Sequence, residues 1–374
     1  REICWMPRRD DLRIHTVFFW RPDGAGGRVM RAGDRVFAVD PGFRLKTAKP
    51  LTGDEAVWTT LPQSPRDLAP LDAHRVFVAL NDRTAALYEE GKDQPLWRRR
   101  FSLGRESYVS AGPEVITAAE EDGTLHALDP ATGRTRWTRQ VETRRWTSET
   151  GLANRTVLRQ AGGVVLVPDR RRPTQLECVD AATGRHLWSV RTDAQFGQVA
   201  LGDNLVLLGS ESGHVTAMHP RTGATVFDVA VCPAFEWAEH YMRLAVGPAG
   251  RQVYAAIGRN VWALDAASGK VLWQWTWQAP KRIEPLPRSY RPAPRLYPVE
   301  DGLFGLFNWE EGTAVPPHKR HVDVVRFAAD GEVRVHETSP RMHGHLVAFA
   351  TGRHLAILNG LTHWEIWEFL PATP

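Results

Sequence analysis

The chain has 374 residues and a net charge of +4, from 47 basic and 43 acidic residues. A charge this close to neutral disfavours nucleic acid as a partner, and since no run of about 18 apolar residues occurs, no transmembrane helix is predicted. The 3 cysteines, Cys4, Cys178 and Cys232, are odd in number and far apart, which argues against a disulfide framework or a cysteine-based zinc site.

The first hundred residues predict strands joined by irregular turns. Residues 1–11 are charged and mixed, and we expect a tail. Residues 13–20 predict a strand, and residues 29–39 predict two strands around Ala32-Gly33-Asp34. Residues 75–80 and 85–88 then predict a hairpin ahead of Trp97.

A motif becomes clear at residues 122–137. Asp122-Gly123 is a hairpin turn signal, and residues 124–128 alternate polar and apolar as a half-buried strand does. Asp129 opens a second turn, in which its carboxylate can accept backbone N–H bonds, and Gly133 supplies a special backbone conformation. The next strand carries Trp137, a large flat side chain suited to packing between layers.

The motif recurs with its spacing unchanged. Its further copies are Cys178, Asp180, Thr183, Gly184 and Trp188; Ala217, His219, Thr222, Gly223 and Phe227; and Ala263, Asp265, Ser268, Gly269 and Trp273. Steps of roughly 40 to 50 residues with only strand and turn signals are typical of a β-propeller blade. We therefore predict structural anchors at the recurring positions: Trp97, Trp137, Trp188, Phe227, Trp273, Asp129, Asp180, Asp265, Gly133, Gly184, Gly223 and Gly269. Cys178 takes the small-residue position of its copy, so we expect it to be buried.

One earlier segment matches the motif only in part. Ala38 and Asp40 fit its first two positions, but the match then fails, and Trp58 is a misplaced candidate for its last position.

The pattern Ala-x-Asp-x-x-Thr-Gly-x-x-x-Trp resembles the quinoprotein-type (PQQ-like) propeller repeat, over about residues 105–277. The resemblance implies the fold but not an activity, because the repeat occurs in quinone-dependent dehydrogenases, in BamB-type assembly lipoproteins and in many binding proteins. The dehydrogenases hold their cofactor with a calcium ion and an adjacent cysteine pair, which this chain lacks. We therefore expect no cofactor.

The rest of the chain completes the predicted ring. Residues 278–298 are rich in proline and arginine and predict a long rim loop rather than a domain. Strands are expected at 302–309, 322–328, 332–337, 346–350, 354–358 and 363–369. We predict an all-β chain, residues 1–374, forming a single β-propeller with eight blades of four antiparallel strands. Residues 13–20 would complete the last blade and so close the ring; seven blades is the alternative.

Catalytic signals are weak. The chain has neither a Gly-x-Ser-x-Gly elbow nor a phosphate-binding loop. His321 with Asp323, and His343 with His345, stand two apart on expected strands and are low-weight candidates for a transition metal site. The alternative function is an enzyme or small-molecule binder that uses the central channel, with a histidine-bound metal as one form of it.

The favoured function is a non-catalytic scaffold that binds another protein through its rim loops. Phe235, Glu236 and Trp237 lie in an insertion outside the repeat frame, where large aromatic residues commonly form interface hot spots. The other candidate contacts are Trp277, Arg291, Arg295 and Trp309. We expect a cytoplasmic bacterial protein; the alternative is an exported BamB-like assembly factor whose leader is missing from this chain.

Overall fold

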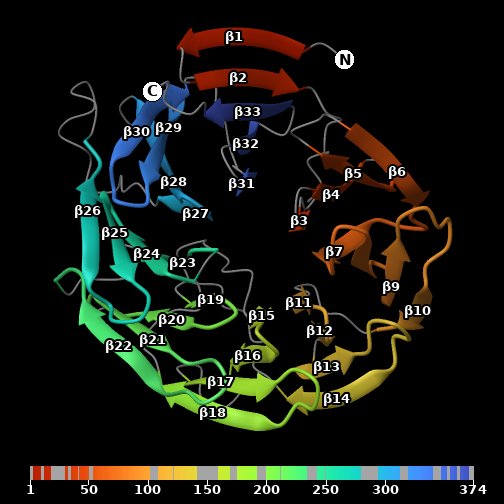
Figure 1. Ribbon diagram of the computed structural model, residues 1–374. Coiled ribbons are helices and arrows are strands. Elements are labelled where there is room, and N and C mark those ends of the chain that lie inside the picture. Colours follow the sequence, from red (N-terminus) through yellow and green to blue (C-terminus); the bar gives the residue numbers. More distant parts are fainter. Residues whose placement is uncertain are drawn as a thin grey trace.

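The computed structural model describes residues 3–9, 12–17, 30–32, 35–40, 42–49, 54–101, 108–120, 122–140, 159–168, 175–191, 199–210, 212–233, 242–248, 250–278, 294–311, 319–339, 347–351, 354–359 and 363–369. Within these ranges every regular element is a β-strand. The strands form separate small sheets that stand side by side around a central space (Figure 1).

Seven of these sheets have four antiparallel strands each. From the innermost strand outward, the first three are β3 (Met30–Ala32), β4 (Arg35–Val39), β5 (Arg44–Lys49), β6 (Asp54–Thr60); β7 (Pro65–Pro70), β8 (Arg75–Leu80), β9 (Thr84–Glu89), β10 (Trp97–Arg100); and β11 (Tyr108–Ala111), β12 (Ile116–Ala119), β13 (Thr124–Leu128), β14 (Thr135–Gln140). The next two are β15 (Arg159–Ala161), β16 (Val164–Pro168), β17 (Gln175–Asp180), β18 (His186–Arg191); and β19 (Val199–Leu201), β20 (Val206–Gly209), β21 (His214–Met218), β22 (Thr225–Ala230). The last two are β23 (Arg243–Val246), β24 (Gln252–Ile257), β25 (Asn260–Asp265), β26 (Val271–Thr276); and β27 (Arg295–Val299), β28 (Gly302–Glu311), β29 (Lys319–Ala328), β30 (Val333–Ser339). The predicted β-propeller of four-stranded antiparallel blades is confirmed.

One further sheet joins the two ends of the chain. Its order is β31 (Val347–Thr351), β32 (His354–Asn359), β33 (His363–Phe369), β2 (Leu12–Val17) and β1 (Ile3–Arg9). The predicted pairing of an N-terminal strand with the last C-terminal strand is confirmed, since Ile14 of β2 lies opposite Trp367 of β33. The prediction of a tail at residues 1–11 is wrong. Most of that segment pairs as a fifth strand, because the edge of β2 offers it a hydrogen-bonding partner.

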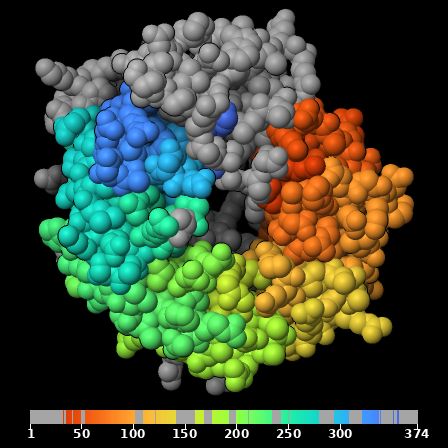
Figure 2. Space-filling model, viewed as in Figure 1, coloured from red at the N-terminus to blue at the C-terminus, as the bar shows by residue number. Residues whose placement is uncertain are grey.

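The hydrophobic core lies between neighbouring sheets. Phe77 and Leu87 of one sheet, for example, pack in a single buried cluster with Ile116 and Leu128 of the next. The innermost strands also contact one another in succession, from β3 through β31. The space-filling view shows a hollow at the centre of this arrangement (Figure 2).

The outermost strand of most sheets contains a β-bulge, which fixes the position of the anchor residue. In β14, Trp137 lies opposite Ala127 while Thr135 lies opposite the next residue, Leu128, so Arg136 is the extra residue. The same irregularity precedes Trp188, Phe227, Trp273 and, in the sheet β27–β30, Val335. The anchors Trp137, Trp188, Phe227 and Trp273 are thus the residues directly after a bulge, whereas no bulge precedes Trp97 in its pairing with β9.

Two predicted boundaries differ from the structure. Asp40 closes the turn between the second and third strands of its sheet, where its side chain accepts from Gly42 N and Arg44 N, so the partial motif match at Ala38 and Asp40 falls one strand early. The predicted rim loop ends sooner than expected, because Arg295–Val299 forms β27 against β28.

Candidate partner-binding surface

The anchor residues hold neighbouring sheets together and are not part of a surface. The indole of Trp137 lies against the turn of the next sheet, where its Nε1 donates to Ala181 O at 2.9 Å. Trp97, Trp188 and Trp273 donate in the same way to Pro130 O, Pro220 O and Ala329 O. Each ring covers a glycine of that turn so closely that a side chain there would collide with it: a Cβ on Gly184 would lie 2.7 Å from Trp137.

The turn that receives each ring is shaped by its aspartate. The Asp129 carboxylate accepts from Ala131 N, Thr132 N and Thr132 Oγ1. Asp180 and Asp265 accept from the residue three positions later in the same manner. The predicted roles of these aspartates in the turn therefore match their contacts.

These aspartates make stability depend on pH. Burial acts to raise the pKa of Asp180, but hydrogen bonds from Thr183 and Arg221 and the charge of Arg221 lower the pKa below its usual value. A folded-state pKa below the unfolded one stabilises the protein above the unfolded pKa, and this stability is lost as pH falls through the folded pKa. We expect the free energy of unfolding to fall below about pH 4. As the pH falls through that range, the Asp180→Asn variant should lose less of its free energy of unfolding than the wild type does, as measured by denaturant titrations at each pH. If the free energy of unfolding falls with pH equally in both proteins, this assignment is contradicted.

Cys178 is buried, as predicted, and lies beneath one anchor. Its side chain is fully buried and its Sγ lies 3.2 Å from Pro220 O, the carbonyl that also accepts from Trp188. Burial raises the pKa of the thiol to about 12. The thiol is therefore not poised as a nucleophile.

Trp277 is buried and does not belong to a surface. Its ring is fully covered and stacks on Phe307, and its Nε1 donates to Asp323 Oδ2 at 2.7 Å. The predicted contact between Trp277 and a partner is therefore wrong. Trp277 follows the end of β26, and the ring turns inward because the buried carboxylate of the next sheet offers an acceptor.

Asp323 organises a buried polar cluster on β29. Besides Trp277, it accepts from Thr338 Oγ1 at 2.8 Å and pairs with His336 Nε2 at 3.1 Å. His321, two positions before it, is also buried. Within the described ranges, no group of three or more side chains could hold a metal ion. The predicted metal site at His321 and Asp323 therefore has no complete set of three ligands among the described residues.

The structure describes the remaining candidate residues only in part or not at all. Phe235, Glu236, Trp237, Arg291, His343 and His345 lie outside the described residues. Trp309 lies on β28, opposite His321 of β29, and its side chain is not described. Arg295 begins β27 and is partly exposed.

The innermost strands carry a strong excess of positive charge. Five of them contain an arginine, and the acidic residue among all eight is Asp67, which is buried. The arginines are Arg31, Arg66, Arg159, Arg243 and Arg295. The sequence prediction missed most of them, because the signal is their shared place in the fold and not a run along the chain.

These arginines lie towards one end of the innermost strands. Arg159, Arg243 and Arg295 are each the first residue of their strand, and Arg31 and Arg66 are second. In a blade of four antiparallel strands, the fourth strand ends on the side where the first strand begins. The connection from one blade to the next therefore also lies on the side where the innermost strands begin. Arg243 and Arg295 are partly exposed, like the next three residues of β23 and β27. The topology thus brings Arg66, Arg243 and Arg295 to one end of the central space, and Arg31 and Arg159 stand at similar backbone positions on neighbouring innermost strands.

No helix within the described part of the chain is long and apolar enough to cross a membrane.

Comparison with known proteins identifies the repeat. The family described as outer membrane protein assembly factor BamB matches residues 17–229 and again residues 121–295, two overlapping placements that a repeating sequence allows. No curated protein matches the chain.

Several solved structures share the fold. BamB from Moraxella catarrhalis is 14% identical over 91% of this chain and 96% of its own, with a TM-score of 0.56. The computationally designed Ika8 protein is 13% identical over 93% and 98%, with a TM-score of 0.61. Hsv2 from Kluyveromyces lactis is 9% identical over 83% and 99%, with a TM-score of 0.56. At these identities the likeness shows the fold alone, whereas the family match covers well over half of the chain. The chain therefore belongs to the BamB-like family of PQQ-like β-propellers.

Proposed function

We propose that this protein is a non-catalytic scaffold that binds an acidic surface of a protein partner at the mouth of the central space where the innermost strands begin. The observation that carries the proposal is the placement of Arg31, Arg66, Arg159, Arg243 and Arg295 at that end. Positive charges gathered in a concave place raise the local concentration of negatively charged partners and speed their association.

The long connections predicted as rim loops belong to the same end. Residues 231–242 follow the outermost strand β22 and precede the innermost strand β23, and residues 277–294 connect β26 with β27 in the same order. Phe235 and Trp237 are therefore proposed as apolar contacts beside the arginines, since interface cores favour aromatic residues and rims favour charge.

Reversing charge tests the proposal directly. The double variant Arg243→Glu and Arg295→Glu is expected to lose the partner that the wild type retains in affinity purification from the native cell, and the wild-type complex should weaken as salt is raised. Arg334→Glu on the outermost strand β30 is the matched control, because Arg334 is exposed and far along its sheet from the innermost strand. Partner recovery that is equal in all three proteins would contradict the proposal.

The aromatic contacts are tested separately. Replacing Phe235 and Trp237 with alanine should reduce recovery of the same partner while the thermal unfolding midpoint stays unchanged. Unchanged recovery would remove the insertion from the proposed interface.

A second candidate is an exported factor that assists protein assembly. The family description, outer membrane protein assembly factor BamB, favours it. Fractionation of the native cell distinguishes the two cases, because an exported factor is recovered with the cell envelope and a cytoplasmic scaffold with the soluble cytoplasm.

A further inference from the structure

Two neighbouring sheets carry a large side chain at a turn position where other sheets carry glycine. The turn between β4 and β5 has Phe43 at φ 60°, and the turn between β8 and β9 has Arg83 at φ 62°. The turns between β12 and β13 and between β20 and β21 have Gly123 and Gly213, at φ 88° and 81°. Among the described residues other than glycine, only Phe43 and Arg83 have a positive φ.

Backbone hydrogen bonds show that these turns correspond to one another. Phe43, Gly123 and Gly213 each donate their N–H to the carbonyl of the residue three positions earlier, at 2.9, 3.1 and 3.0 Å. The carbonyls of Phe43, Arg83 and Gly213 accept from the residue that directly follows the outermost strand of the same sheet, at 2.8, 2.6 and 2.9 Å. The backbone therefore has one design, and the difference lies in the side chain.

Both large side chains cost stability at this position. The left-handed conformation brings Cβ too close to the backbone, which is why glycine is the usual residue there. Phe43 is 39% exposed and Arg83 is also exposed, so burial does not offset the strain. Strained backbone positions of this kind are typical of functional sites.

One short connection holds the two turns together. Residues 61–64 lead from β6 towards β7, and Leu61 N donates to Phe43 O at 2.8 Å. Ser64 O accepts from Asn81 N at 3.2 Å, in the turn that carries Arg83. Since four extended residues span at most about 14 Å, both turns lie within reach of one short segment of a partner.

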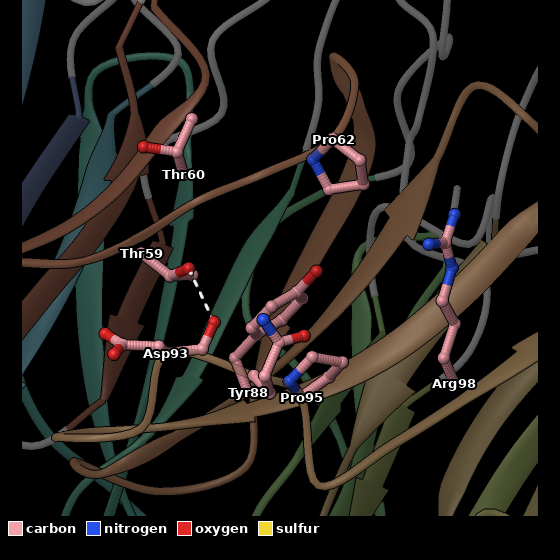
Figure 3. Close-up of a pocket in the computed structure, with 8 residues that line it drawn as sticks. Thr59, Thr60, Pro62, Tyr88, Asp93, Pro95 and Arg98 are labelled. Carbon is pink, nitrogen blue, oxygen red and sulfur yellow. Dashed lines mark hydrogen bonds between the residues drawn. The ribbon is translucent and has the colours of Figure 1, made fainter.

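The surface beside this connection is hollowed (Figure 3). A pocket of about 480 Å³ is lined by Thr60 and Pro62, on either side of Leu61, and by Arg98 of β10. Arg98 pairs with Asp82, the residue before Arg83, at 2.6 Å. The pocket thus lies against both segments that hold the two turns, and a polypeptide side chain can enter it.

Positive charge dominates the turn of Arg83. Arg100 lies opposite Thr84, the residue after Arg83, and is exposed. Asp82 is already paired with Arg98, so no described contact neutralises Arg83 or Arg100. The innermost strand adds Arg66, whose Nε donates to Asn81 Oδ1 of this turn at 3.1 Å. The turn is therefore continuous with the arginines at the beginning of the innermost strands.

We propose that Phe43 and Arg83 form the centre of the partner interface and recognise an acidic polypeptide segment that carries a large apolar side chain. The partner's carboxylates would face Arg83 and Arg100, and its apolar side chain would pack beside Phe43. Exposed aromatic and arginine side chains are the commonest interface hot spots, which accounts for their retention at strained positions. This inference rests on the proposed function, since it takes the partner to be an acidic protein.

The test uses the whole protein and the fluorescein-labelled peptide Glu-Asp-Phe-Asp-Glu, with binding followed by fluorescence anisotropy. We expect the wild type to bind with a Kd of about 0.1 to 1 mM. Phe43→Gly and Arg83→Gly should each weaken binding at least fivefold. Their thermal unfolding midpoints should equal or exceed that of the wild type, because glycine relieves the strain.

Controls separate recognition from general charge. Arg185→Ala removes an exposed arginine from the turn between β17 and β18, at the other end of a sheet, and should leave peptide binding unchanged. Peptides with serine in place of phenylalanine, or with glutamine and asparagine in place of the acids, should bind the wild type more weakly. No binding by the wild type, equal binding by the glycine variants, or lower unfolding midpoints of those variants would overturn the inference.

The native partner distinguishes this inference from the proposed function. The Phe43→Gly and Arg83→Gly variants should lose the same partner that the double variant Arg243→Glu and Arg295→Glu loses. If only the double variant loses it, the proposed function stands and the role of Phe43 and Arg83 is overturned. If all of these variants retain it, the proposed function fails as well.

Discussion

Replacing Trp188 with alanine is expected to lower the free energy of unfolding by about 3–5 kcal/mol. Only 8% of Trp188 is exposed, and its ring packs in a core cluster shared by the sheets β15–β18 and β19–β22. Its Nε1 donates to Pro220 O at 2.7 Å, and Gly223 of the same turn lies directly beneath the ring. The variant therefore opens a cavity between two blades and also leaves the Pro220 carbonyl without its indole donor.

Trp188→Phe separates the two contributions. Phenylalanine keeps most of the ring but not the N–H, as Phe227 does at the same position of the next sheet. We expect a loss of about 1 kcal/mol for the hydrogen bond, beyond a smaller packing loss. Chemical denaturation followed by circular dichroism measures both values. A loss below about 1 kcal/mol for the alanine variant would contradict the view that these rings hold the blades together.

The sequence predicts this part of the fold well because the motif is local. An aspartate, a threonine, a glycine and a tryptophan within about nine positions fix one turn and the ring that follows it, and each residue acts through its own backbone or its immediate neighbours. The anchors Trp137, Trp188 and Trp273 can therefore be placed from the sequence alone.

The candidate sites are harder to predict, because they depend on contacts between distant residues. Trp58 is an anchor in residue type alone, and only the pairing of β5 with β6 and its hydrogen bond to Thr47 show that it packs within its own sheet. The arginines of the innermost strands are far apart in the chain, from Arg31 to Arg295, and the topology alone brings them to one end. The position of Trp277 after a strand end suggests exposure, but a carboxylate 46 residues away accepts its N–H.

The Asp323 carboxylate makes the second large prediction. Asp323→Ala is expected to destabilise the protein by about 3 kcal/mol or more, because the buried donor Trp277 Nε1 and the partly buried donor Thr338 Oγ1 lose their acceptor together. Asp323 is only 2% exposed, so water has little access to replace it. The cost should appear as a lower denaturation midpoint with an unchanged slope against denaturant.

Asparagine at this position distinguishes a structural carboxylate from a metal ligand. The amide of Asp323→Asn can keep its oxygen towards Trp277 and donate its NH₂ to the Thr338 hydroxyl, which accepts as well as donates. We therefore expect Asp323→Asn to cost less than about 1 kcal/mol. The pair Asp323→Ala and Trp277→Phe should cost less than the sum of the single variants, since the new phenyl ring brings no N–H that needs an acceptor and can still stack on Phe307. Strict additivity, or an asparagine variant as unstable as the alanine one, would show that Asp323 acts through its charge and not through these hydrogen bonds.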